Sequence, residues 1–364
     1  MTSESKAPTP ERIAQAAREL RPRVLEALAL MADALADDLA ERLLMVAWER
    51  EEQIGDVQRR LGELGRRRFS KLGGPPARVR ELNKQPLDGL ALAWEMLCRG
   101  RRVHLESERG SCPGAFRIAR DFVPSLPAGA LSVSAPGVYE HAQADWPSVG
   151  VEASRERIAL IQTDADPELA AYLLTRACLR RTGFDPRVVH HVVVVGSPDR
   201  LVRNLRRLWV GARMGPVDDE RAFSGPVTEL NADLYLACDK RWRGHEGITT
   251  ICPGDRLQRA DAPEACFLAP ALFRAPSFAG EFEVVDTLPA CAGPMLVVHP
   301  VAESADEREL GERLLTRLAQ ERGHGGHLRF GHKPREVELR PIDHQVHGAL
   351  LVERLPPGLP EPRP

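Results

Sequence analysis

The chain has 364 residues, of which 43% are hydrophobic and 28% charged, and its 50 Lys and Arg almost balance its 52 Asp and Glu. The balanced charge excludes the strong basic excess of a dedicated nucleic-acid-binding protein, and the apolar content excludes a chain too polar to build a core. At about 100–200 residues per domain, the length predicts two domains or one large α/β unit.

The sequence predicts a cytoplasmic protein with no membrane partner. The N-terminal segment MTSESKAPTPER has no apolar core of the kind that a secretion signal needs. No stretch approaches the roughly 18 apolar residues of a membrane span. The seven Cys are odd in number and form no CxxC, so we expect reduced thiols rather than disulfides or a structural zinc site.

Residues 10–70 have a helical pattern. Pro22 suits a helix start, where its missing N–H is not needed. Apolar residues then recur at steps of three and four and predict one buried stripe, until Gly73–Pro76 (GGPP) breaks the pattern. The stripe consists of Val24, Leu28, Met31, Leu35, Leu39, Leu43 and Val46.

Helices and strands alternate after this break. Pro86–Arg99 and Ala115–Phe122 have helical patterns, and Val103–Leu105 and Leu131–Val133 are typical of short strands. Such alternation predicts βα units around a parallel sheet.

A second series of alternating elements follows, so two successive α/β sheets fit the sequence best, with a boundary near residue 150. Asp166 and Ser197 are the expected N-caps of two of its helices, the second with Pro198 at its first position. The predicted strands are Ile158–Ile161, Val188–Val195 and Met295–Val298, and the predicted helices are Pro167–Arg181, the one after Ser197, and Asp306–Arg322.

Histidines gather near the C-terminus, but we do not expect a metal site. Zinc ligands need short, fixed spacings on well-ordered elements, and these residues show no such pattern within a helix. His190 and His191 are neighbours on a strand and therefore point to opposite faces, one of them into the core. The C-terminal histidines are His324, His327, His332, His344 and His347.

Familiar phosphate-binding and hydrolase motifs are absent from the sequence. There is no GxGxxG after a strand, no GxxxxGK[ST] and no GxSxG. Arginines cluster at Arg66–Arg68, Arg99–Arg102 and Arg200–Arg207, and the neutral total charge favours solvated faces there.

Six stretches, in this order, resemble motifs of the aldehyde dehydrogenase superfamily and together span about residues 15–320. The resemblance implies an α/β fold of two Rossmann-like parallel-sheet domains with N-terminal helices and a C-terminal β-extension. The stretches are PLDGLALAW with GRRVHL (86–94 and 100–105), LPAGALSV (126–133), TDADPELA (163–170), VGARMGP with SGP (210–216 and 224–226), CFLAP as far as Phe273 (266–273), and GPM (293–295).

The resemblance also implies a division of the chain. N-terminal helices and a truncated cofactor-type domain would occupy residues 1–150, and a catalytic-type α/β domain residues 151–330. Residues 331–364 would supply strands at Val337–Leu339 and Val346–Leu351 and a Pro-rich tail. Because the family dimerises through a terminal β-extension, we expect a homo-oligomer or a hetero-oligomer with a related protein.

The residues that align with the family's catalytic groups differ from them. In the family, a Cys attacks an aldehyde, hydride passes to NAD(P), and a Glu acts as general base. The nucleophile motif GQxC aligns with residues 183–186, so Pro186 falls on the Cys. Proline has no nucleophilic atom. The base aligns with Glu152, which lacks the family's following glycine pair and is more typical of an exposed loop.

Other aligned positions also depart from the family. The Asn that holds the oxyanion aligns with Lys84, one step from Asn83. The cofactor-binding Lys aligns with Glu106, which reverses the charge, and the ribose-binding Glu falls near Pro289 or Ala290.

The segment that would hold a cofactor is missing from the sequence. The family's FTGS segment holds the pyrophosphate at a helix N-terminus and has no counterpart in residues 137–150, so no cofactor is expected. These departures predict a pseudoenzyme with a structural, assembly or regulatory role. Two alternatives stay open: an NAD(P)-dependent aldehyde oxidoreductase with Cys178 or Cys112 as a relocated nucleophile, and a small-ligand binding protein that uses the interdomain cleft.

Overall fold

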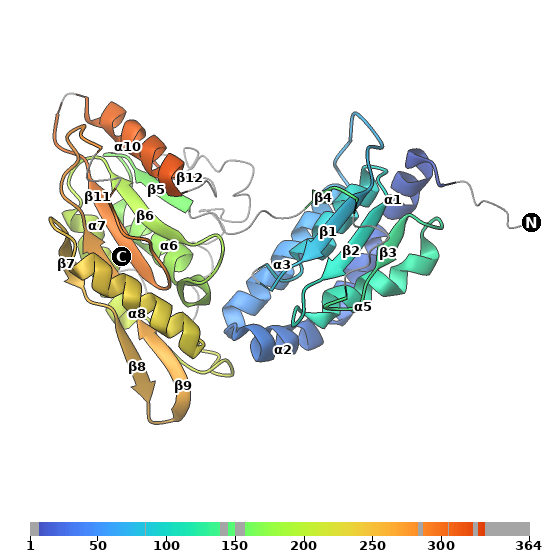
Figure 1. Ribbon diagram of the computed structural model, residues 1–364, viewed down its shortest axis with the longest axis horizontal. Coiled ribbons are helices and arrows are strands. Elements are labelled where there is room, and N and C mark those ends of the chain that lie inside the picture. Colours follow the sequence, from blue (N-terminus) through green and yellow to red (C-terminus); the bar gives the residue numbers. More distant parts are fainter. Residues whose placement is uncertain are drawn as a thin grey trace, which may run out of the picture. The chain divides into compact units, whose positions relative to one another are not determined.

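Figure 1 shows the computed structural model, which describes residues 7–83, 85–138, 145–149, 157–282, 287–304, 306–322 and 327–331. The chain divides into two units, each with its own sheet and core. Both sheets are built from parallel strands, as the alternating pattern predicts. Unit 1 comprises Met1–Met45 and Glu49–Glu152, and unit 2 comprises Val46–Trp48 and Ala153–Pro364.

The first part of the chain is helical, as its apolar stripe predicts. Val24, Leu28, Leu35 and Leu39 are fully buried in the core of unit 1. Leu44 has a left-handed backbone (φ 54) and ends the second helix. The three helices are α1 (Pro10–Leu30), α2 (Ala32–Leu43) and α3 (Ala47–Leu64).

Pro22 does not start a helix, and the sequence-based expectation is wrong on this point: it lies inside α1. The helix begins after Thr9, whose hydroxyl accepts a hydrogen bond from the Arg12 amide at 3.4 Å, with Pro10 in the first turn. Thr9 and Pro10 therefore supply both a cap and a preset φ, which is a stronger start signal than a lone proline. Burial of the flanking apolar residues offsets the one backbone hydrogen bond that Pro22 lacks.

Four parallel strands form the sheet of unit 1, in the order β3-β2-β1-β4. The central pair is in register along its whole length, from Ala77 opposite Val103 to Glu81 opposite Ser107. The strands are β1 (Ala77–Glu81), β2 (Val103–Ser107), β3 (Leu131–Val133) and β4 (Ser148–Val149), and the helices that pack on them are α4 (Asp88–Cys98) and α5 (Pro113–Phe122).

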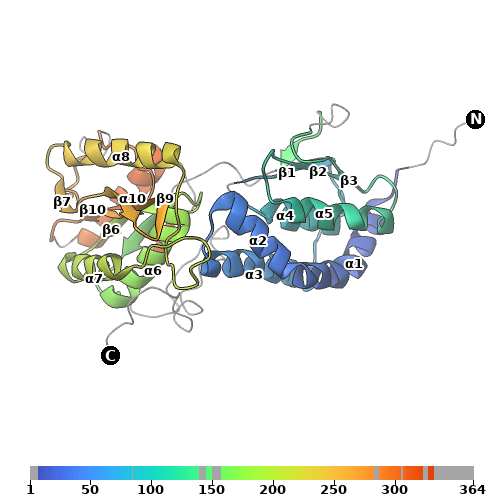
Figure 2. The ribbon, with the colours of Figure 1, turned by 90° about the horizontal axis from the view of Figure 1, so that it is seen from below.

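The helices of unit 1 lie on one face of this sheet. Figure 2 shows α4 and α5 next to the strands, with α1, α2 and α3 beyond them. Val79, Leu105 and Leu131 project toward these helices and belong to the core. Because side chains alternate along a strand, their neighbours project from the opposite face. We call this second set the polar sheet face; it consists of Arg78, Arg80, His104, Glu106, Ser132 and Ser134.

The sheet of unit 2 has six strands in the order β12-β5-β6-β11-β10-β7, all parallel except β7. Helices α6 and α7 cover one face, and α8 and α10 cover the other (Figure 2). A separate antiparallel pair, β8 and β9, extends from this unit. The elements are β5 (Arg157–Ile161), α6 (Pro167–Leu179), β6 (Val189–Val194), α7 (Asp199–Gly211), α8 (Glu229–Arg243), β7 (Thr249–Cys252), β8 (Asp255–Arg259), β9 (Ala262–Ala269), β10 (Ala271–Arg274), β11 (Met295–Pro300), α10 (Glu307–Arg322) and β12 (His327–Phe330).

One predicted N-cap of unit 2 is confirmed, and the other is confirmed in part. The Asp166 carboxylate accepts hydrogen bonds from the Glu168 and Leu169 amides at 2.8 and 3.3 Å, as a cap should. At the next helix, Pro198 rather than Ser197 is the N-cap residue. Pro198 nevertheless has helical φ and ψ (−79 and −7), and the Ser197 hydroxyl accepts a hydrogen bond from the Asp199 amide at 3.4 Å, so Ser197 still caps the first turn.

The predicted strands Val337–Leu339 and Val346–Leu351 lie outside the described residues. Within the part of the chain that the structure describes, no helix combines the length and the apolar character needed to cross a bilayer.

Candidate functional site

The loop that enters β6 carries the residues aligned with the family's nucleophile motif. It follows the short helix η3 (Arg180–Gly183), in which Arg181 and Thr182 have left-handed backbones with φ of 50 and 51. This reversal brings Pro186 to the entrance of β6, where the alignment puts the nucleophile. The Pro186 ring offers neither an acid, a base nor a nucleophile for chemistry there.

The residue before this proline is held in a buried ion-pair cluster. Asp185 is 3% exposed, and its carboxylate lies 3.2 Å from Arg180 Nε and 3.2 Å from Arg187 Nε. It also accepts a hydrogen bond from the Arg187 amide at 2.8 Å. Burial alone would raise the pKa of the Asp185 carboxyl, but the two guanidinium groups outweigh it and hold that pKa well below its ordinary value. The group is therefore a fixed anion rather than a proton donor or acceptor.

Close packing fixes the rest of the loop. Gly183, with φ of 75, lies so near Gly293 that a Cβ on it would be 2.0 Å from the Gly293 carbonyl carbon. Thr182 Oγ1 is 2.9 Å from Ser224 Oγ, and both residues are buried. His190 Nε2 is 3.1 Å from the Gly293 carbonyl oxygen. Contacts with Gly293 and Ser224 thus hold the loop in place.

The two cysteines considered as relocated nucleophiles are fully buried. Cys178 lies on α6, and its thiol donates a hydrogen bond to the Met295 carbonyl oxygen at 3.2 Å. Burial raises the pKa of the Cys178 thiol far above its ordinary value. Burial likewise raises the pKa of Cys112 to about 12. Because the thiolate is the nucleophilic form, both thiols are inert at neutral pH.

Glu106, aligned with the family's cofactor-binding Lys, lies on the polar sheet face and is 1% exposed. Its carboxylate oxygens lie 3.4 Å from Arg80 Nε, 3.9 Å from Arg78 Nε and 3.8 Å from His104 Nε2. Both ring nitrogens of the fully buried His104 are 2.8 Å from serine hydroxyl oxygens, so a network of charges and hydrogen bonds fills this face. The hydroxyls belong to Ser132 and Ser134.

The other aligned positions do not form a shared site in the described part of the chain. The backbone N–H of Asn83 donates a hydrogen bond to Glu108 Oε2 at 3.0 Å, and Asn83 lies in a turn. The Ala290 carbonyl oxygen accepts a hydrogen bond from a tryptophan ring at 3.2 Å. Lys84 and Glu152 lie outside the described residues, so the alignment of Glu152 with the general base stays a prediction.

Glu81, at the end of β1, is a buried carboxyl that no sequence motif indicates. Glu81 is fully buried, and its carboxylate accepts hydrogen bonds from the Leu87 and Leu90 amides at the start of α4. Burial raises the pKa of Glu81 to about 8, and the neighbouring Asp88 carboxylate adds to the rise. Glu81 is therefore largely protonated at neutral pH.

We expect Glu81→Gln to flatten the pH dependence of unfolding. A carboxyl whose pKa is raised by folding favours the folded state at low pH, and that stability is lost as the pH rises from about 4.5 to about 8. The wild-type free energy of unfolding should therefore fall by a few kcal/mol between pH 5 and pH 8. Urea titrations followed by circular dichroism measure the slope, with the exposed Glu11→Gln as the control. Equal slopes in wild type and Glu81→Gln would contradict the assignment.

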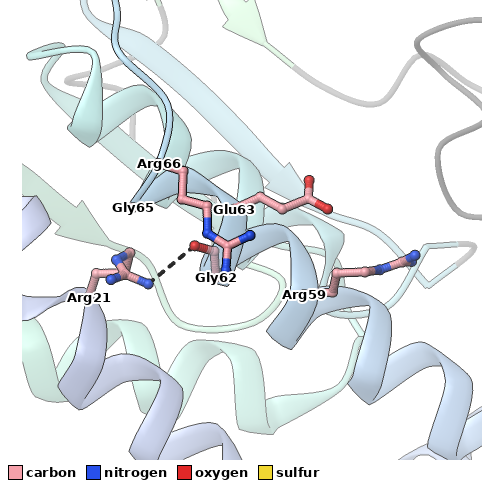
Figure 3. A pocket seen from close by; sticks show the side chains of 6 residues that line it. All are labelled: Arg21, Arg59, Gly62, Glu63, Gly65 and Arg66. Atoms are coloured by element: carbon pink, nitrogen blue, oxygen red, sulfur yellow. Dashed lines mark hydrogen bonds between the residues drawn. The ribbon is translucent and has the colours of Figure 1, made fainter.

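Unit 1 has a pocket of about 530 Å³. None of the residues aligned with the family's catalytic groups lines it (Figure 3). Arg21 of α1 donates a hydrogen bond to the Gly62 carbonyl oxygen at 3.3 Å, and its guanidinium lies against the backbone of Gly65. The basic lining would suit an anion, although no sequence motif predicted it. The other residues around it are Arg59, Glu63 and Arg66.

A metal site has no support in the described residues, where no three His, Cys, Asp or Glu side chains converge as ligands. Of the C-terminal histidines, His324, His332, His344 and His347 lie outside those residues.

The sequences of β1 and β2 contain a pattern that predicts the polar sheet face. ARVRE in β1 and VHLES in β2 alternate apolar and polar residues, whereas strands covered on both faces read as continuous apolar runs. The Asp185 ion pairs had no comparable signal, because the left-handed turn that brings Arg180 to Asp185 contains two non-glycine residues.

The fold matches those of aldehyde dehydrogenases of known structure. The NAD-dependent aldehyde dehydrogenase from Sinorhizobium meliloti superimposes with a TM-score of 0.68 at 14% identity, over 94% of this chain and 74% of that one. The methylmalonate-semialdehyde dehydrogenase from Oceanimonas doudoroffii gives 0.67 at 16% identity, over 88% and 73%. No family model and no curated protein sequence matches the chain. The chain has the aldehyde dehydrogenase fold, as the six stretches predicted.

Proposed function

We propose that this protein uses the aldehyde dehydrogenase fold for a structural, assembly or regulatory role and does not oxidise aldehydes through a thiol. The observation that carries the proposal is the loop at the entrance of β6. Pro186 stands at the nucleophile position, and the preceding Asp185 is locked between two arginines. Pro186 supplies no sulfur for a covalent aldehyde adduct at this position.

The state of the two cysteines considered as relocated nucleophiles supports the same proposal. A relocated nucleophile would have to reach the substrate and lose its proton near neutral pH. Cys178 and Cys112 are fully buried, and burial raises the pKa of both. Neither meets the two requirements.

The proposal includes no bound NAD(P). Glu106 stands where the family's cofactor-binding Lys would be, on a face that arginines and a histidine share. Between β3 and β5, the described residues contain β4 but no helix whose N-terminus could hold a pyrophosphate.

Exposed apolar side chains on unit 2 support a protein partner, either a second copy of this chain or a related protein. Leu230 and Leu234 lie one turn apart on α8 and are 78% and 50% exposed. Leu257 on the nearby β8 is 38% exposed, and it lines a pocket of about 490 Å³ together with the exposed Val210. Contiguous exposed apolar groups are typical of association surfaces.

Two measurements on the intact chain test the proposal. We expect no reduction of NAD⁺ or NADP⁺ with a panel of aliphatic and aromatic aldehydes, and no saturable NADH or NADPH fluorescence change. An active aldehyde dehydrogenase in the same assay is the positive control. Light scattering after size-exclusion chromatography should give a mass above the 40.2 kDa of one chain.

Specific results would overturn the proposal. Aldehyde-dependent NAD(P) reduction that Cys178→Ser or Cys112→Ser abolishes would establish a relocated nucleophile. Saturable dinucleotide binding without turnover would favour a ligand-binding role. A monomer at micromolar concentration, with no partner from the same cell extract, would remove the assembly role.

A further inference from the structure

Three side chains that the proposed function does not use form a hydrogen-bonded chain in unit 2. His191 lies on β6 and His299 on the adjacent β11, on the face of the sheet that packs against α8 and α10. His191 Nδ1 is 3.0 Å from His299 Nε2, and His191 Nε2 is 3.6 Å from Cys291 Sγ. We call Cys291, His191 and His299 the His–Cys cluster.

The His–Cys cluster has a buried end and an accessible end. His191 is fully buried, and His299 is 3% exposed. The ring of Trp242 lies 6.0 Å from that of His191, centroid to centroid. Cys291 is half-buried, in the segment that leads into β11. Of the three residues, Cys291 is therefore the one that a reagent in solution reaches first.

The spacing between the two rings limits where their protons can lie. Two ring nitrogens 3.0 Å apart share one hydrogen bond, so one carries a proton and the other accepts it. With the proton on His191 Nδ1, donated to His299, the Nε2 lone pair of His191 faces the thiol. His191 can then take the thiol proton and donate hydrogen bonds to both neighbours as an imidazolium. This is the arrangement of a nucleophile, a base and a third group that orients the base.

The same geometry argues against a metal at this place. Nδ1 and Nε2 of His191 point to different partners, so the three side chains do not converge on one point. No ligand triad is found among the described residues.

We propose that Cys291 is an activated thiol that His191 deprotonates and that hydroperoxides oxidise to a sulfenic acid. The thiolate sulfur attacks the terminal oxygen of the peroxide, so that an S–O bond forms and the O–O bond breaks. The sulfur is oxidised by two electrons, and the peroxide is reduced to an alcohol, or to water for hydrogen peroxide. The proton held on His191 Nε2 passes to the leaving oxygen, which returns the imidazole to its neutral form.

The chain contains its own matched comparison. Cys252 is half-buried like Cys291, but burial raises the pKa of its thiol. The remaining cysteines are buried. Since exposure and thiolate character together decide the rate of oxidation, Cys291 should be the most reactive cysteine.

The first experiment treats the native, intact protein with hydrogen peroxide and dimedone at pH 7 and measures the adduct on each cysteine peptide by mass spectrometry. An ordinary thiol is about 3% ionised at that pH, so full activation predicts about a 10-fold or greater excess of adduct on Cys291 over Cys252. Iodoacetamide labelling rates of the same two cysteines should show the same ratio. Equal rates for Cys291 and Cys252 in either measurement would overturn the proposal.

A variant separates activation from mere accessibility. His191→Gln should lower labelling of Cys291 about 10-fold and leave labelling of Cys252 unchanged, because only the base is removed. Circular dichroism checks that the variant is folded. If it is not, the ratio of the two cysteines in the wild type remains the deciding measurement. Unchanged labelling of Cys291 in a folded His191→Gln would assign its reactivity to exposure and contradict the role of His191.

Discussion

Replacing Asp185 with Asn is expected to lower the free energy of unfolding of unit 2 by about 3–5 kcal/mol. The substitution keeps the shape of the side chain but removes the charge that faces two guanidinium groups. The side chains of Arg180 and Arg187 are only 8% and 13% exposed, so water replaces little of the lost interaction. Urea denaturation followed by circular dichroism measures the change.

A matched control and a pH series make this expectation specific. Asp199 and Arg274 are also 3.2 Å apart but lie at the surface, so Asp199→Asn should cost at most about 1 kcal/mol. Because folding lowers the pKa of Asp185, its contribution is present above the ordinary aspartate pKa of about 3.9 and is lost as the pH falls below it. The difference between wild type and Asp185→Asn should therefore be constant near neutrality and shrink below about pH 4. Similar costs for Asp185→Asn and Asp199→Asn would refute the buried-pair interpretation.

Gly183→Ala is expected to destabilise unit 2 by about 4 kcal/mol or more, or to prevent its folding. The added Cβ would lie 2.0 Å from the carbonyl carbon of Gly293 and 2.2 Å from its oxygen. The nearest atoms all belong to the backbone of Gly293 and Pro294, so no flexible side chain can move away from the added Cβ. The left-handed φ of 75 adds a further cost of about 1–2 kcal/mol. The yield of soluble protein and its unfolding midpoint measure the effect.

Gly129→Ala isolates the backbone part of this cost. Gly129 has a nearly equal φ of 77, but nothing lies within 4 Å of an added Cβ. We expect Gly129→Ala to cost only the 1–2 kcal/mol of the left-handed backbone. If both glycine variants lost the same stability, the close approach of Gly183 to Gly293 would not constrain the loop.

The sequence predicts elements well where one local signal dominates. The apolar stripe of residues 24–46 predicts the N-terminal helices because a period near 3.6 has a single structural meaning. Asp166 predicts the start of α6 because its carboxylate satisfies amides within the same turn. The run of β-branched residues predicts β6, which is buried along its whole length.

Elements whose apolar residues do not mark one buried face were missed. Leu230 and Leu234 on α8 are exposed, and its buried face includes the charged Asp239, so apolar residues do not mark one face of this helix. Residues along β8 are mostly exposed, and its pairing with β9 gives no apolar run. Such elements are defined by contacts distant in sequence, which no local pattern contains.

The sequence predicts that Pro186 lies at the entrance of β6 but not the contacts around it, and its match to the family's nucleophile stays a prediction. Alignment of the six stretches located Pro186 at the entrance of β6, because the flanking helix and strand fix the loop between them. The buried pairs of Asp185 depend on left-handed φ angles at Arg181 and Thr182, which their residue types do not indicate. The His–Cys cluster joins residues about 100 positions apart, so only the sheet register brings them together.

If the chain binds no dinucleotide, as we propose, the polar sheet face limits how unit 1 could acquire that binding. A grafted helix would need an apolar surface to pack on, and it would bury the side chains of Arg78 and Arg80 beside the already buried Glu106. Each charge buried without its present partners would lower the free energy of unfolding by several kcal/mol. Replacing one charged residue would leave its partners unpaired, so no single substitution would improve the fit of the graft. The changes would have to be made together, which places a dinucleotide-binding form of this unit many coupled substitutions away.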